Sequence, residues 1–138
     1  MSIAVINGEK PISSILAYAI DDDFSFYFIT HPQSFKAIAL QKHPKVSLSV
    51  WEKSKMLVQV DGVASVVPTE DREIAMGKIA TAMSEVDNFW PPLFRVVGSG
   101  PESREYIIFK ITPTWLRALD LSHITIKERE LPFSEYTF

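Results

Sequence analysis

From residue types alone, a catalytic triad can be assembled from three residues of this 138-residue chain. Ser34, His31 and Asp61 would supply the nucleophile, the base and the carboxylate of a hydrolase triad. Many hydrolases present their serine in a Gly-x-Ser-x-Gly elbow, and the sequence contains no such motif. We therefore do not expect hydrolase chemistry from these residues.

Side chains that could bind a metal ion are also poorly arranged. Residues 21–23 are three consecutive aspartates, whereas a calcium loop spaces its oxygen ligands and ends in a glutamate. His31, His43 and His123 fall in separate loops, without the spacing of zinc ligands. Aspartates are favoured in turns, so we interpret residues 21–23 as a turn and expect no metal site.

Two further classes of site can be weighed from residue types. The run Gly98-Ser99-Gly100 could cradle a phosphate with backbone N–H groups, but Pro101 follows and no helix start is evident. A plain loop is the better interpretation. The chain has no cysteine, which excludes a disulfide framework, a thiolate nucleophile and cysteine-ligated metal or iron–sulfur sites. The sequence thus carries no catalytic signature built from side chains.

Composition limits the partners and the compartment. The net charge of -3 is spread without a basic run, which gives nucleic acid or an anionic membrane no electrostatic footprint. No stretch approaches about twenty apolar residues, and the start lacks a signal-peptide pattern. These features predict a cytoplasmic protein that is not embedded in a membrane. The 9 Phe, 4 Tyr and 3 Trp residues indicate that some aromatic surface faces a partner subunit or a planar ligand.

Most of the chain has the composition of short β-strands. Period-two alternation or β-branched and aromatic enrichment predicts strands over residues 2–6, 12–20, 24–29, 45–51, 56–67, 105–111 and 115–121. Gly62 interrupts one of these segments, where a bulge or sharp bend is expected. Residues 124–138 alternate only briefly and are either an edge strand or a mobile end.

Two helices are predicted between the strands. Ser34 is a suitable N-cap for residues 35–42, and Thr69 is expected to cap the second helix. The apolar side chains expected to pack are Phe35, Ile38 and Ala39 in the first helix and Ile74, Ala75, Ile79, Ala82, Met83 and Val86 in the second. Tight turns between short strands favour an antiparallel barrel over a parallel α/β sheet, so we expect residues 1–138 to form one mainly β (α+β) domain.

One long stretch has a specific likeness. Residues 15–30, followed by Ser-Phe-Lys-Ala at 34–37 and His-Pro-Lys-Val-Ser-Leu at 43–48, resemble the core of the pyridoxamine 5'-phosphate oxidase-like FMN-binding split β-barrels. The likeness covers roughly residues 3–67. It implies an antiparallel split β-barrel of six or seven strands with two short helices, and a homodimer with FMN sites at the subunit interface.

The resemblance also implies which residues contact the cofactor. Lys36, in the first turn of a helix capped by Ser34, would bind the FMN phosphate with its ammonium group and free N–H donors. From their residue types alone, Trp51, Phe89 and Trp90 are candidates to stack on the flavin, to seal the dimer or simply to pack in the core. The implied cofactor-binding residues are Ser14, Ile15, Leu16, Ala17, Ile29, Thr30, Ser34, Phe35, Lys36 and Trp90.

Three positions depart from the oxidase pattern. Ser14 and Phe35 stand where the oxidase has arginines, and Leu57 stands in place of a glutamine. The oxidase's C-terminal substrate-binding segment is also missing, so we do not expect oxidation of pyridoxamine phosphate. Two hypotheses remain: an FMN-dependent oxidoreductase acting on an unidentified small molecule, or a stress-related protein that binds a flavin, a deazaflavin or haem without turnover.

Overall fold

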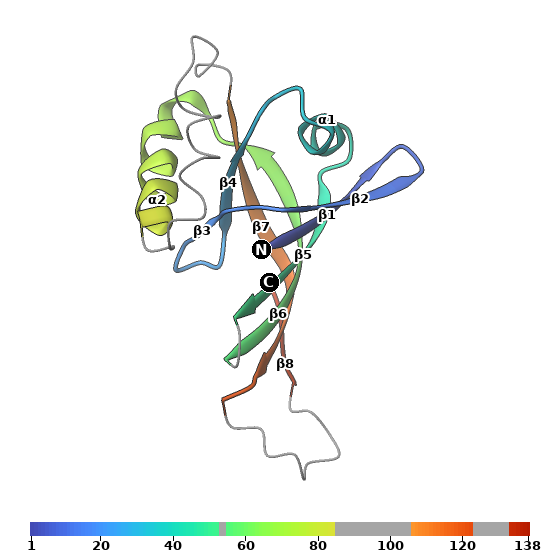
Figure 1. The fold of residues 1–138 in the computed structure, drawn as a ribbon, viewed down its shortest axis with the longest axis vertical. Helices are drawn as coiled ribbons and strands as arrows, with labels where there is room; N and C mark the ends of the chain where they lie inside the picture. Colours follow the sequence, from blue (N-terminus) through green and yellow to red (C-terminus); the bar gives the residue numbers. More distant parts are fainter. Residues whose placement is uncertain (53–54, 85–105, 123–132) are drawn as a thin grey trace.

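The computed structural model describes residues 1–52, 55–84, 106–122 and 133–138 (Figure 1). Its eight strands form one antiparallel sheet, one strand more than the predicted upper number. The strands are β1 (Ser2–Asn7), β2 (Lys10–Ile15), β3 (Ala19–Ile20), β4 (Phe26–Thr30), β5 (Lys45–Glu52), β6 (Met56–Val66), β7 (Ile107–Asp120) and β8 (Phe133–Thr137). The helices are α1 (Phe35–Lys42) and α2 (Arg72–Ser84), with a 3₁₀ turn at Thr69–Asp71. The predicted mainly β, antiparallel split-barrel class is confirmed.

The sheet closes because its two ends are consecutive in the chain. The strand order is β2-β1-β5-β6-β7-β4-β3, and only residues 16–18 separate β2 from β3. Leu16 still exchanges backbone hydrogen bonds with Met1, at 2.8 and 3.0 Å. The prediction of a single strand over 12–20 is therefore wrong, because the chain pairs with β1 up to Leu16 and with β4 from Ala19.

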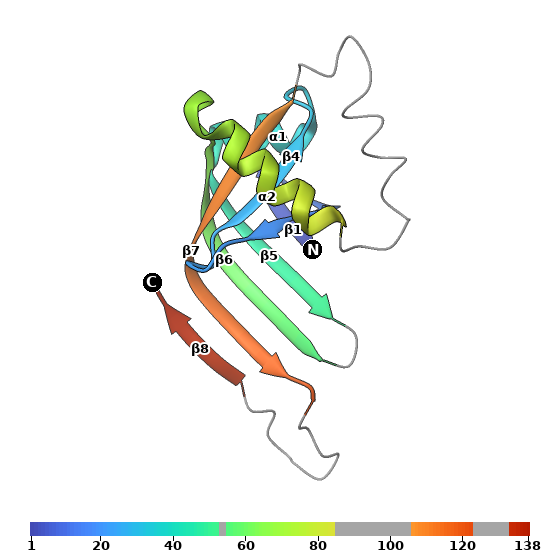
Figure 2. The same cartoon turned by 90° about the vertical axis from the view of Figure 1, so that its left-hand side faces the viewer.

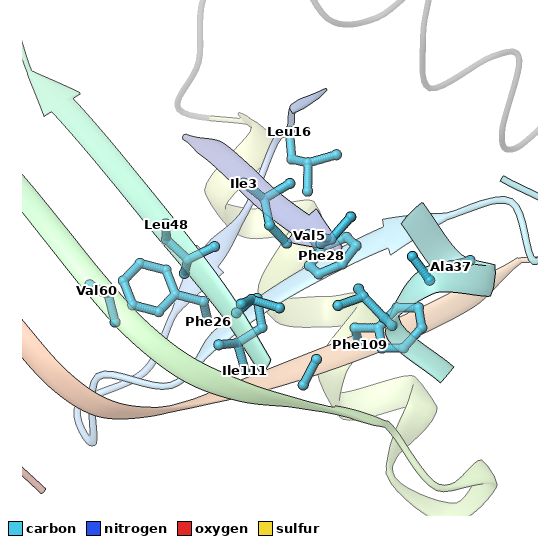
Figure 3. Packing of buried hydrophobic residues seen from close by; sticks show 14 of the residues in the cluster. Ile3, Val5, Leu16, Phe26, Phe28, Ala37, Leu48, Val60, Phe109 and Ile111 are labelled. Atoms are coloured by element: carbon cyan, nitrogen blue, oxygen red, sulfur yellow. The ribbon is translucent and has the colours of Figure 1, made fainter. Parts of the chain in front are cut away.

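The barrel interior is filled by apolar side chains from β1, β4, β5, β6 and β7 and from α1 (Figure 3). Phe28 and Phe109 are opposite each other on β4 and β7, and their rings stack with centroids 5.4 Å apart. On β5, Val46 and Leu48 are buried whereas Ser47 is exposed, as the predicted alternation requires. This packing holds β1, β4 and α1 on a common core.

Helix α2 lies on the outside of the barrel against β3, β4 and β7 (Figures 1 and 2). Ala75 and Ile79 are its buried residues. Ile74 is 64% exposed, so its assignment to the packed stripe is wrong, and Val86 lies outside the described residues. Thr69 does not cap α2, because it belongs to a 3₁₀ turn that starts at Pro68 without a side-chain capping bond. In the described part of the chain neither helix has the length and apolar character to cross a membrane.

A bulge lets β7 continue where two strands were predicted. Asp61 pairs with Trp115 and Gly62 pairs with Pro113, so Thr114 is left over and donates its hydroxyl proton to the Asp61 carbonyl at 3.1 Å. Pro113 cannot donate a ladder hydrogen bond, and a bulge is one of the places where a sheet tolerates proline. The bend predicted at Gly62 is confirmed, and the two-strand prediction for 105–121 is wrong.

The turn before β4 is tighter than predicted. Residues 21–24 close with a hydrogen bond from the Phe24 amide to the Asp21 carbonyl at 2.9 Å. Phe24 has φ 60°, a conformation that bulky side chains adopt rarely. The strand therefore begins at Phe26 and not at Phe24, where the sequence placed its start.

We predict that Gly62→Ala destabilises the protein. A Cβ at this position would lie 2.7 Å from the Thr112 carbonyl oxygen and 2.9 Å from Cγ2 of Ile111. Overpacking of this kind typically costs about 1–3 kcal/mol, which urea unfolding would measure. Gly77→Ala on α2 is the matched control, since nothing lies within 4 Å of its Cβ; it should gain up to about 1 kcal/mol. Equal stabilities of the two variants would contradict the assignment of a close contact at the bulge.

Candidate functional site

The end of β4 and the start of α1 form a small polar cluster. Thr30 is only 6% exposed, and its hydroxyl lies 3.1 Å from the hydroxyl oxygen of Ser34. Ser34 also accepts a hydrogen bond from the Ala37 amide at 3.2 Å, which caps α1 as predicted. Helix geometry leaves the N–H groups of Phe35 and Lys36 without partners inside the helix. The cluster therefore presents donors at a helix N-terminus.

Lys36 is the cation of this cluster. Its side chain is half-buried, and burial lowers the pKa of its ammonium group below the usual 10.5. The first turn of α1 contains no acidic residue. A partly desolvated cation next to free helix amides favours an anion such as a phosphate.

Strand β1 lies between the polar cluster and the predicted residues at the end of β2, since it contacts α1 and pairs with β2. Helix α1 packs on β1, and β1 pairs with β2 so that Ile3 is opposite Ser14. Ser14 and Ala17 are half-buried, whereas Ile15 is 75% exposed. Leu16 is buried in the barrel core and its backbone N–H and C=O both bond to Met1. Ser14, Ile15 and Ala17 thus keep surface that a ligand can contact, and Leu16 has little to offer.

Of the other predicted residues, Ile29 lies away from the cluster, and the Phe35 side chain is exposed. Ile29 packs with the core beneath α2, on the opposite face of β4 from Thr30 because strand side chains alternate. Phe35 was predicted to pack but is 75% exposed. Trp90 and Phe89 lie outside the described residues. Trp51 is exposed and pairs across the hairpin with Leu57.

Three of the residues weighed for hydrolysis and metal binding, Asp21, Asp23 and Ser34, have structural partners. Asp21 lies 2.5 Å from Lys78 of α2, and Asp23 lies 3.6 Å from Lys110 of β7. The aspartate run therefore ties the β3–β4 turn to α2 and β7. Ser34 acts as a helix cap, which accounts for its side chain without a nucleophilic role.

Sequence reasoning missed Tyr18 and Glu52. Burial raises the pKa of the Tyr18 hydroxyl, and the negative charge of Glu52 adds to the increase. Their proximity depends on the pairing of β3 with β4 and of β5 with β6, which no local pattern reveals. The aromatic excess was the only signal in the sequence that pointed to such residues.

Comparisons with known proteins agree with the fold. The family model described as pyridoxamine 5'-phosphate oxidase matches residues 1–120. General Stress Protein 26 of Bacillus anthracis has a TM-score of 0.63 at 19% identity, over 98% of this chain and 87% of that one. A FAD-binding protein of Mesorhizobium loti gives 0.61 at 19%, over 85% and 82%. A heme binding protein of Mycobacterium smegmatis gives 0.63 at 12%, over 99% and 51%. A comparison with curated proteins found no match.

We predict that Lys36→Met raises the free energy of unfolding at neutral pH, because it removes a charge that folding desolvates. In the unchanged protein, the free-energy cost of burying the charged ammonium group falls as the pH rises through the lowered pKa of Lys36 towards 10.5. In that window the unfolded state binds more protons, so stability increases with pH. The gain from Lys36→Met should shrink accordingly in urea titrations at rising pH.

Lys42→Met is the control for this experiment, since Lys42 is an exposed lysine in the last turn of the same helix. The difference in free energy of unfolding between Lys42→Met and the unchanged protein should stay the same over this pH range. A Lys36→Met effect that stays constant from neutral to alkaline pH would argue against desolvation of the ammonium group.

Proposed function

Because this chain belongs to the pyridoxamine 5'-phosphate oxidase family, we propose that it binds FMN and acts as an FMN-dependent oxidoreductase. The observation that carries the proposal is the half-buried Lys36 in the first turn of α1, two residues after the N-cap Ser34, whose hydroxyl lies 3.1 Å from that of Thr30. The absence of cysteine fits the reducing cytoplasm, where we place the protein.

The polar cluster suits the phosphate end of FMN. Lys36 would contribute a charge-assisted hydrogen bond, and the Phe35 and Lys36 amides would donate from the helix N-terminus. Ser34 already accepts from Ala37, so its hydroxyl proton can point to Thr30 or to a phosphate oxygen. A phosphate bound here would restore to Lys36 the charge stabilisation that burial removes.

The ring end of the cofactor calls for a second subunit. Ile15 and Phe35 are each 75% exposed in the single chain, and apolar side chains left so open beside a ligand site favour burial by a partner. We propose a homodimer in which the second copy covers this region and excludes water from the flavin. Bound flavin would supply the hydride or electron transfer itself, so the chain has to place it and needs no acid–base pair.

A second candidate is a stress-related protein that binds a flavin, a deazaflavin or haem without turnover. The charge of the site favours this candidate. Lys36 is the only cation among the ten predicted cofactor-binding residues, since the uncharged Ser14 and Phe35 stand where the oxidase has arginines. A single cation would hold a phosphate dianion weakly. Leu57 likewise offers no polar group where the family pattern has an amide.

The absorbance spectrum and mass of the purified protein would separate these candidates. We expect flavin absorbance, or its appearance on titration with FMN, in a species with the mass of two chains. A haem-type Soret band would favour the second candidate. A monomer that binds no FMN would sink the proposal.

We predict that Lys36→Ala weakens FMN binding by more than about 1 kcal/mol, the scale of one lost hydrogen bond to a charged group. Quenching of flavin fluorescence on titration would measure the dissociation constant. Lys42→Ala, at the other end of α1, should bind FMN like the unchanged protein. Identical FMN affinities for the two variants would contradict the proposal that the phosphate binds at this helix terminus.

Ser34→Asp provides a sharper version of the same experiment. Aspartate caps helices about as well as serine, so stability should be kept within about 1 kcal/mol, as urea unfolding would show. The added carboxylate would repel the phosphate, and FMN binding should be lost. Retention of binding would show that the phosphate lies elsewhere.

A further inference from the structure

An apolar hollow opens where β5, β6 and β7 extend beyond the barrel. Figure 2 shows these three strands running on past the helices. Its volume is about 510 Å³, within the roughly 300–1,000 Å³ typical of small-molecule pockets. Val58 and Ala118, which are paired in register on β6 and β7, lie in its wall. These side chains pack against the apolar cluster that fills the barrel core, but both are only partly buried.

Aromatic pairs enclose the hollow on two sides. Tyr18 and Phe26 form one pair, with ring centroids 5.8 Å apart, and Phe24 and Phe138 form the other at 6.0 Å. Phe24 takes part in spite of its positive φ. Strained backbone of this kind is concentrated at binding sites. Aromatic walls of this type suit a planar ring.

The charges of the hollow define the ligand further. Among the described residues that line it, Glu52 is the only charged one, and its carboxylate is already 2.6 Å from the Lys55 ammonium group. The lining therefore provides no cation for an acidic ligand. The Tyr18 hydroxyl, like that of any tyrosine, is protonated at neutral pH, and burial raises its pKa further. It can therefore donate a hydrogen bond.

We propose that this hollow binds a neutral, apolar ring compound and that the Tyr18 hydroxyl hydrogen-bonds the ligand's polar group. The proposal goes beyond flavin binding, because none of the ten residues predicted to contact the cofactor lies in the lining. A small molecule suits the hollow better than a second copy does. The site is concave, and the chain's own Phe138 closes part of its rim.

The test uses Nile red, a neutral planar dye whose emission shifts to the blue in apolar surroundings. The purified protein should bind one dye per chain. Val58→Trp fills the hollow and should weaken binding at least about tenfold, equivalent to 1.4 kcal/mol. Gln59→Trp introduces the same side chain at the neighbouring exposed position, on the opposite face of β6, and should leave binding unchanged. Urea unfolding of both variants would establish that they are folded.

Four results would overturn the proposal. The first is equal dye affinity in the two tryptophan variants. The second is equally tight binding of the anionic ring compound 8-anilinonaphthalene-1-sulfonate, which would contradict a neutral ligand. The third is displacement of Nile red by FMN, which would assign the hollow to the cofactor. The fourth is an unchanged protein that binds no dye and is a dimer, while Val58→Trp is a monomer; the hollow would then be an interface between copies.

Discussion

The whole architecture depends on one crossing, in which the chain leaves β1 after Leu16 and pairs with β4 from Ala19. This short link closes the sheet into a barrel and separates two environments. Residues before the crossing, such as Ile15, lie on the strand next to β1 and α1. Tyr18, within it, lines the aromatic hollow. A proposed cofactor site and a proposed ligand pocket thus share one connecting segment.

The sequence allowed us to predict elements whose ends are set by residues close by in the chain. Ser34 caps α1 through its own side chain, and the helix spans 35–42 as the sequence indicates. Elements defined by distant partners were harder to predict. Nothing within residues 12–20 shows that pairing changes from β1 to β4, and Pro113 seemed to end a strand because only the bulge opposite Gly62 accommodates it.

The candidate site was predictable to the same extent. The cap, Lys36 and Thr30 come from one short stretch, and the structure places the Thr30 and Ser34 hydroxyls 3.1 Å apart at the start of α1. The inward orientation of Leu16 and the position of Ile29 beneath α2 depend on tertiary packing that composition does not encode. The hollow was missed because Tyr18, Val58 and Ala118 meet only after the sheet has formed.

Strand β7 has different neighbours along its two halves. It pairs with β6 along most of its length, while on its other side β4 covers residues 107–111 and β8 covers residues 115–119. Exposed β8 can fray by breaking five register pairs without disturbing the barrel core. The amides of β8 should therefore exchange with solvent faster than those of β4. Local separation of β8 from β7 would require only a small fraction of the free energy of global unfolding.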